Sequence, residues 1–118
     1  EDAKVREQFG KPIGSFQAIQ HKCANMLVEV ESSKSVTYYA AWAVANDVAE
    51  APLAAAMAKA YCSDAYRHAS GEGIQIHGGI GYTTGLSLER ELRDAIPATL
   101  FSGTSEIQRD LIARELGL

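Results

Sequence analysis

The chain has 118 residues, of which 47% are hydrophobic and 22% are charged, and its net charge is −4. This length and composition suit a single domain with one hydrophobic core, and the acidic balance argues against the clustered basic surface that nucleic-acid binding requires. No apolar run approaches the length of a membrane span, and the first ten residues lack the pattern of a signal peptide.

The first ten residues, EDAKVREQFG, predict the last two turns of a helix that has no start signal of its own. Gly10 and Pro12 are expected to end this helix, because neither residue favours its continuation. We therefore expect the chain to be a fragment of a larger protein, with the first helix of its bundle truncated.

Two long helices are predicted over residues 16–49 and 52–76. Ser15 is expected to cap the first, and Pro52 suits the first turn of the second. Apolar residues in both recur in steps of mostly three and four, which is the spacing of one helix face. The residues expected to face inward are Phe16, Ile19, Cys23, Met26, Leu27, Val30, Thr37, Ala41, Val44 and Val48, and then Leu53, Met57, Ala60, Tyr61, Ala65 and His68.

A glycine-rich loop and two shorter helices are predicted for the rest of the chain. Residues 78–85, GGIGYTTG, form a loop by composition. One helix over 86–95 should end before Pro97, and a last helix should cover 104–116. No segment alternates with a period of two, so we expect an all-α, up-and-down helical bundle. In the last helix, Ser105 and Gln108 have the spacing of a capping box, and Ile107, Leu111 and Ile112 are expected to face inward.

Neither the cysteines nor the histidines indicate a covalent or metal framework. Cys23 and Cys62 lie within helical segments, and we interpret both as small core side chains. His21 and Cys23 stand two residues apart, on different helix faces, and no histidine pair has the spacing of a helical metal motif. No metal is expected.

Three short motifs each allow a structural and a functional interpretation. The glycines of QIHGGIGY, residues 75–82, would let a ligand approach the backbone, or they would simply turn the chain at a helix end. FSGTSEIQR, residues 101–109, places a helix N-terminus where it could hold an anion, as any capped helix could. REQFGKP, residues 6–12, offers a cation, an amide and an aromatic ring, or forms a surface loop.

Their order and combination are more specific. The series REQFGKPIGSFQAIQ, QIHGGIGYT, LERELRDA and GTSEIQRDLIARELGL resembles the C-terminal helical domain of the acyl-CoA dehydrogenase family over practically the whole chain. The resemblance implies that residues 1–118 follow an N-terminal helical domain and a middle β-domain, both absent here. It also implies a location in the bacterial cytoplasm or the mitochondrial matrix.

The activity implied by the resemblance is the oxidation of an acyl-CoA thioester to the trans-2-enoyl-CoA in fatty acid metabolism. FAD would be bound at a subunit interface of a homodimer or homotetramer. A carboxylate would remove the α proton while the β hydrogen leaves as hydride to the flavin. An electron-transfer flavoprotein, or another acceptor, would be the redox partner.

The resemblance further implies which residues contact ligands. Arg6 would pair with the FAD diphosphate, characteristically that of the neighbouring subunit, and the glycine turn would approach the partner's FAD as well. Ser102 and Gly103 would border the acyl thioester. The full set implied to contact FAD is Arg6, Glu7, Gln8, Phe9, Phe16, Gln17, Gln75, Ile76, His77, Gly78, Gly79, Thr104, Ser105 and Glu106.

Ser102 departs from the common pattern of the family, in which a glutamate stands directly before the Gly-Thr pair and acts as the base. An unactivated hydroxyl cannot replace a carboxylate in removing a proton from carbon. Either the base lies on the preceding helix, which ends near Glu7, or the chain belongs to a non-catalytic family subunit that binds flavin and a partner. A plain helical interaction module is a third alternative, which the flavin-linked motifs disfavour.

Overall fold

The computed structural model describes every residue of the chain, 1–118, and is almost entirely helical. Between the helices lie a short hairpin and two 3₁₀ helices, and no helix is both long and apolar enough to cross a membrane. The predicted all-α, up-and-down bundle is confirmed. Its elements are α1 (Asp2–Val5), β1 (Glu7–Gln8), β2 (Lys11–Pro12), a 3₁₀ helix (Ile13–Ser15), α2 (Gln17–Ala45), α3 (Ala51–His77), a 3₁₀ helix (Gly78–Tyr82), α4 (Leu88–Ala98) and α5 (Ser105–Glu115).

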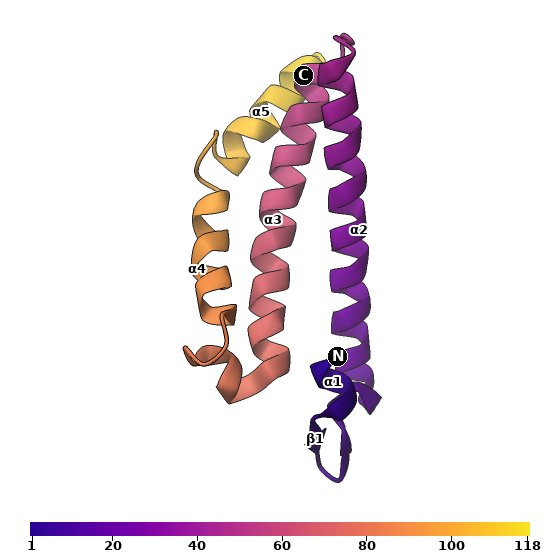
Figure 1. Cartoon of the computed structure of the whole chain (residues 1–118). Coiled ribbons are helices and arrows are strands. Elements are labelled where there is room, and N and C mark those ends of the chain that lie inside the picture. The colour runs from indigo at the N-terminus through magenta and orange to yellow at the C-terminus, as the bar shows by residue number, and fades with distance from the viewer.

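Helix α3 is the centre of the bundle. It runs antiparallel to α2 and also packs against α4 and α5, so that it lies between α2 and the two shorter helices (Figure 1). Pro52 stands in its first turn, as predicted, and Gly78 ends it with a positive φ of 62°. Both long helices that the sequence predicts are present, with ends within a few residues of the expected positions.

The face of α2 that packs on α3 lies beside the predicted one. Its less exposed residues follow alternating steps of three and four, the 3.5-residue period of helices that pack at a small angle. Apolar side chains occupy two neighbouring faces of α2, and only one of these faces meets α3. The inward residues are Ile19, Lys22, Met26, Glu29, Ser33, Val36, Ala40 and Ala43, whereas the predicted Cys23, Leu27, Val30, Thr37, Ala41 and Val44 are exposed.

Small side chains dominate the buried part of the bundle. Ala40, Ala43, Ala54 and Ala58 form its hydrophobic cluster, and no large side chain is fully buried. The predicted inward positions of α3 and α5 are therefore only partly confirmed, because alanines and small polar residues carry the burial instead. Ala60 is buried and Leu53, Ala65 and Ile112 are half-buried, but Met57, Tyr61, His68, Ile107 and Leu111 are exposed.

Much apolar surface stays uncovered by the chain. Only 14 of the 118 residues are buried. The radius of gyration is 17.4 Å, whereas a compact domain of this length has about 13–14 Å. The bundle is thus long and thin, and the sides of its two long helices are accessible to other protein surfaces.

The N-terminal segment differs from the prediction. Helix α1 ends at Val5, and Arg6 is already in an extended conformation. The hairpin turns through Phe9 and Gly10, which have positive φ angles of 55° and 76°. Because two consecutive left-handed residues reverse the chain here, the predicted helix up to Gly10 is wrong, and Arg6 is freed from helical geometry.

Three predicted helix ends are also corrected. The Ser15 hydroxyl donates to the Pro12 carbonyl rather than capping α2. Pro97 lies inside the last turn of α4, where it removes one backbone hydrogen bond close to the helix end and does not stop the helix before it. The capping box at Ser105 is wrong as well, because Thr104 is the N-cap of α5 and its side chain accepts the Ile107 N–H at 3.3 Å.

The two cysteines are free and differ in environment. Cys62 is half-buried, with its Sγ atom 3.4 Å from the Thr37 hydroxyl and 3.6 Å from the Ser33 carbonyl. Cys23 is exposed on α2, so the expectation that it lies in the core is wrong. It stands on the face of α2 that does not meet α3.

Candidate functional site

The fold brings the first group of predicted ligand-contacting residues together at the C-terminal end of α3. Arg6 follows α1, and it meets the turn at the C-terminus of α3, although the two segments are 71 residues apart. One guanidinium nitrogen of Arg6 donates to the carbonyl of His77. A Cβ atom added to Gly78 would lie 3.3 Å from the other terminal nitrogen of Arg6. We call Arg6, His77 and Gly78 the arginine cluster.

Arg6 is held in place by a hydrogen bond that occupies only part of its hydrogen-bonding capacity. A guanidinium has five N–H donors in a fixed fork, and the His77 carbonyl accepts from one terminal nitrogen. His77 is itself fixed, since its Nδ1 atom lies 2.8 Å from the Gly73 carbonyl and its Nε2 atom 3.8 Å from the Asp2 carboxylate. The remaining donors of Arg6 can therefore bind an anion in a defined direction.

An apolar pocket of about 340 Å³ adjoins the arginine cluster. Its two aromatic rings, Phe9 and Phe16, contact each other edge to face with centroids 6.1 Å apart, and the Lys11 ammonium lies 4.4 Å from the Phe16 ring centre. Phe9 is 93% exposed, so its ring is available to a flat partner. The pocket is lined by Arg6, Gln8, Phe9, Ile13, Phe16, Ala18, Ile19 and Ile76.

Five predicted contacts lie in or near this pocket. Glu7 and Gln8 form β1, pair with β2, and are exposed. Gln17 and Gln75 are exposed at the adjacent ends of α2 and α3. Gly79 has open space where a Cβ atom would stand. The structure thus gathers this part of the predicted set at one end of the bundle.

The second group lies on the loop that joins α4 to α5. Ser102 and Gly103 have positive φ angles of 57° and 89°. The amide of Gln108 donates to the Ser102 carbonyl at 2.9 Å, and a Cβ atom on Gly103 would lie only 2.5 Å from the nitrogen of that amide. The Ser105 N–H closes the loop by donating to the Thr99 carbonyl at 3.1 Å. We call residues 99–105 the thioester loop, after its predicted role.

Helix α3 fixes the other end of the thioester loop. The carbonyl of Ala98, the last residue of α4, accepts hydrogen bonds from Lys59 Nζ at 3.1 Å and from the Ser63 hydroxyl at 2.8 Å. On the α5 side, Arg109 pairs with Asp64 of α3 at 2.8 Å. The loop is therefore held by contacts from both α3 and α5, and its position is a property of the bundle.

Ser102 itself has none of the features of an activated nucleophile or base. Its side chain is exposed, and its hydroxyl makes no hydrogen bond within the chain. The neighbouring Phe101 is 60% exposed, so the loop presents an apolar surface beside the serine. The structure supplies no base for a proton at carbon at this position.

Thr104, Ser105 and Glu106 form the first turn of α5 and its cap. The pKa of Glu106 is below its ordinary value because its carboxylate accepts from its own backbone N–H and from the Thr104 hydroxyl. The Ser105 hydroxyl is buried without a hydrogen-bond partner. A polar pocket of about 350 Å³ adjoins this turn, lined by Asp64, Arg67, Thr99, Leu100, Ser105, Glu106 and Arg109.

The two groups of predicted residues are separate. Ser63, which holds the thioester loop, and His77, which belongs to the arginine cluster, are fourteen residues apart on α3, and that interval corresponds to about 20 Å along a helix. One small pocket cannot contain both groups. The predicted set therefore forms two contact regions, one at the lower end of the bundle and one near the middle of α3 (Figure 1).

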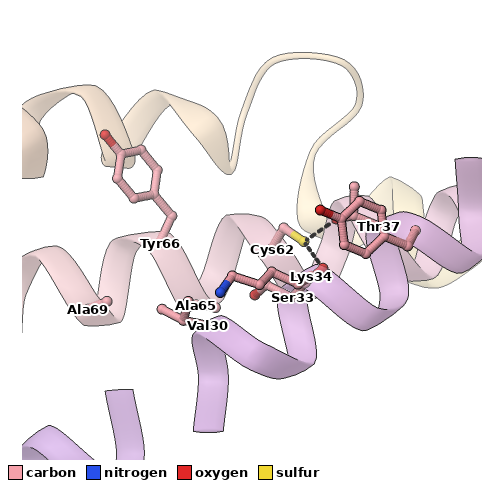
Figure 2. Close-up of a pocket in the computed structure, with 9 residues that line it drawn as sticks. Val30, Ser33, Lys34, Thr37, Cys62, Ala65, Tyr66 and Ala69 are labelled. Carbon is pink, nitrogen blue, oxygen red and sulfur yellow. Dashed lines mark hydrogen bonds between the residues drawn. The ribbon is translucent and has the colours of Figure 1, made fainter. Parts of the chain in front are cut away.

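A third concave surface lies away from both groups. An apolar groove of about 430 Å³ follows the seam between α2 and α3 (Figure 2), and no predicted ligand contact lines it. The Cys62 thiol points toward Thr37 and Ser33 across this seam. Its lining residues are Val30, Ser33, Lys34, Thr37, Tyr38, Cys62, Ala65, Tyr66 and Ala69.

Sequence reasoning missed the role of Gln108. It treated this residue as half of a capping box, whereas the structure shows it buried, 8% exposed, against the thioester loop. The spacing between Ser105 and Gln108 predicted the wrong partner for the glutamine. Its side chain reaches the carbonyl of Ser102, six residues earlier, instead of the backbone of Ser105, three residues earlier. Arg67 and Arg109, which border the polar pocket, were also not singled out.

Comparisons with known proteins agree with this arrangement. Residues 1–117 match the family described as acyl-CoA dehydrogenase, C-terminal domain. The probable acyl-CoA dehydrogenase YngJ of Bacillus subtilis is 46% identical over 114 residues, which are 97% of this chain and 30% of that protein. An L-prolyl-(peptidyl-carrier protein) dehydrogenase of Pseudomonas fluorescens is 39% identical over 118 residues, which are 100% of this chain and 31% of that protein.

A solved structure shows the same fold at high similarity. The crystal structure of an FAD-dependent dehydrogenase superimposes with a TM-score of 0.96 and 41% sequence identity. The match covers 99% of this chain and 31% of the dehydrogenase chain. The chain thus spans about 30% of the length of the curated relatives that it matches.

Proposed function

Because the chain belongs to the acyl-CoA dehydrogenase family through its C-terminal domain, we propose that it is part of an FAD-dependent dehydrogenase that converts an acyl-CoA thioester to the trans-2-enoyl-CoA. The chain would be the C-terminal domain of a longer flavoprotein. Its role would be to bind the cofactor and border the substrate. The observation that carries the proposal is the arginine cluster, in which Arg6 and Gly78 meet although they are far apart in sequence.

The residues of the arginine cluster fit a dinucleotide cofactor. Arg6 keeps donors that suit a diphosphate, and the glycine at position 78 leaves a cradle that a side chain would fill, since its Cβ atom would meet Arg6. Phe9 presents an exposed ring beside this cradle. Where FAD is bound, it would accept the hydride that leaves the β carbon.

The thioester loop would contact a different part of the active site. Its Ser102 and Gly103 would border the acyl thioester, and the first turn of α5 would meet the flavin. Because the two regions stand about 20 Å apart on α3, we propose that each chain contributes to two flavin sites, its own and that of a neighbouring subunit. A homodimer or homotetramer is then required to complete each site.

The catalytic base is proposed to lie outside residues 1–118. Ser102 occupies the common position of the base, and its hydroxyl has no activating partner. A carboxylate on the helix that precedes the hairpin would provide a base of suitable strength. The second candidate function, a non-catalytic flavin-binding subunit, rests on this same observation at Ser102.

Substitution of Arg6 tests flavin binding. Loss of a charge-assisted contact to phosphate costs about 1.5–3 kcal/mol, so Arg6→Ala in the full-length protein should lower FAD affinity by about 10- to 150-fold, with the helical content unchanged. The matched control is Arg114→Ala, which removes an exposed arginine from the last turn of α5. Equal FAD affinity in the two variants would refute the proposed role of Arg6.

Anaerobic single-turnover reduction of the flavin tests the activity and the substrate class. Mixing the full-length protein with acyl-CoA substrates should reduce bound FAD and form the enoyl-CoA. If only an acyl group on a carrier protein reduces the flavin, the substrate is a carrier-protein thioester and the proposed acyl-CoA substrate is wrong. Tight FAD binding without reduction by either thioester would favour the non-catalytic subunit.

A further inference from the structure

We propose that Gln108 is a positioning residue that fixes the thioester loop, and so the backbone that borders the substrate. The proposal rests on the function proposed above for Ser102 and Gly103. Gln108 is a neutral side chain, only 8% exposed, in the second turn of α5. Its amide donates to the carbonyl of Ser102, so that it would act on the substrate through the loop backbone.

The backbone of the thioester loop needs such a support. Ser102 is a non-glycine residue with φ of 57°, and Gly103 follows it with φ of 89°. A left-handed conformation costs roughly 1–2 kcal/mol for a residue with a side chain, so an unsupported loop would relax toward other conformations. The hydrogen bond from Gln108 to the Ser102 carbonyl, 2.9 Å long, stabilises the observed conformation.

The fit between Gln108 and Gly103 is close. A Cβ atom on Gly103 would lie 2.5 Å from the amide nitrogen of Gln108 and 3.6 Å from its amide carbon. Glycine at this position therefore makes room for the amide, and the amide in turn occupies the space above the glycine. The two residues form one unit that sets the direction of the Ser102 side chain.

The hydrogen bonds of this unit point to a positioning role. The buried side chain of Gln108 donates to the Ser102 carbonyl in a partly buried hydrogen bond. Removing the donor costs the free energy of this hydrogen bond. The Ser105 N–H, which donates to the Thr99 carbonyl, closes the other side of the loop. Without Gln108, the Ser102 carbonyl loses its donor, and the loop keeps this second closure and the contacts at its two ends.

Two substitutions separate the hydrogen bond from the side-chain volume. Gln108→Met keeps the length of the side chain and removes the donor. Gln108→Glu places a carboxylate against the carbonyl, and this carboxylate can donate only when it is protonated. The control is Gln20→Met, because Gln20 is an exposed residue of α2 that takes no part in either contact region.

Hydrogen exchange of the thioester loop in the full-length protein is the first measurement, with and without FAD. Gln108→Met should accelerate exchange over residues 99–105 by roughly five- to tenfold, the effect of one lost hydrogen bond. Gln108→Glu should behave likewise at pH 8. Its exchange, corrected for the intrinsic effect of pH, should approach that of the wild type toward pH 5. Wild-type exchange in Gln108→Met would overturn the proposal.

Flavin reduction is the second measurement. Gln108→Met should retain FAD and lower the rate constant of single-turnover reduction more than it raises the KM for the thioester. The Glu variant should recover part of its rate as the pH falls. Faster exchange with an unchanged reduction rate would overturn the positioning role. A wild-type protein that reduces no flavin would instead refute the proposed function, and the exchange measurement would still decide whether Gln108 fixes the loop.

Discussion

Two turns of the backbone form the candidate site, and in each a single side chain donates to a carbonyl of the turn. At the end of α3, the donor is Arg6, which comes from 71 residues away and is charged. At the start of α5, the donor is Gln108, which is six residues away, neutral and buried. The donor to the first turn thus depends on the tertiary fold, whereas the donor to the second turn comes from the same local segment.

This difference between the two donors suggests two roles: Arg6 is suited to binding a ligand, and Gln108 is suited to supporting the backbone. Arg6 gives one terminal nitrogen to the turn and keeps further N–H groups for an anion. Gln108 is enclosed and faces the loop alone, so it has no free surface for a ligand. A long-range charged contact is suited to a site that a cofactor completes, and a local neutral contact is suited to a backbone that must keep its shape.

The largest effect is expected where backbone packs against backbone. A Cβ atom on Gly81 would lie 2.8 Å from the Ile74 carbonyl and 2.9 Å from the Cβ atom of His77, and neither can move freely. Gly81→Ala should therefore lower the free energy of unfolding by about 1–3 kcal/mol, as measured by urea denaturation. Gly79→Ala is the control, because open space surrounds that position. Similar losses in both variants would contradict this account.

Sequence reasoning predicted the elements better than their contacts. The absence of helix breakers between residues 17 and 45 and the proline at position 52 were sufficient for two long helices. The packed face of α2 was not predictable from hydrophobicity, because exposed residues such as Leu27 and Val44 are as apolar as the buried ones. Which face meets α3 depends on close contact between alanines, and this is a property of the helix pair.

The sequence indicated which residues belong to the candidate site, but it did not predict how they are arranged. The resemblance supplied Arg6 and Gly78, but no local pattern indicates that the chain leaves helical geometry at Arg6 and reaches the end of α3. The capping prediction failed for a similar reason. Thr104, Ser105 and Gln108 all offer suitable polar groups, and only the structure shows that Thr104 caps α5 while Gln108 donates to the Ser102 carbonyl.

A smaller loss is expected from Gly103→Ala than from Gly81→Ala. Its positive φ of 89° would strain an alanine, at a cost of roughly 1–2 kcal/mol. The atom that its Cβ meets is the end of the flexible Gln108 side chain, which can move aside. Since both changes break one contact, Gly103→Ala and Gln108→Met should be clearly less than additive in denaturation experiments. Additive losses would show that the two residues do not form a unit.

Thr104→Ala should cost about 1 kcal/mol of stability, the usual effect of losing an N-cap side chain, because Ile107 N–H then loses its partner. The same change should raise the pKa of Glu106, since the Thr104 hydroxyl is one of the groups that lower it. A lowered pKa in the folded state gives stability above the pKa of the unfolded chain, and this stability is lost as the pH falls through the folded value. Titration of the Glu106 carboxylate by NMR in both proteins measures the shift. An unchanged pKa would separate Glu106 from the cap.

The smallest effect is expected at Ser102, although the resemblance to the family implies that it stands at the common position of the base. Its hydroxyl is exposed and makes no hydrogen bond within the chain, so Ser102→Ala removes at most one contact to the substrate. Such a contact contributes about 1 kcal/mol, and flavin reduction by the thioester should therefore stay within about tenfold of the wild-type rate. Replacing the proposed carboxylate on the preceding helix should lower the rate of flavin reduction by about 10²–10⁴-fold, the contribution of a positioned base.

A collapse of the reduction rate in Ser102→Ala, with FAD bound and hydrogen exchange of the thioester loop unchanged, would assign the serine a direct part in the chemistry. It would also show that the two turns differ less in function than their hydrogen bonds indicate.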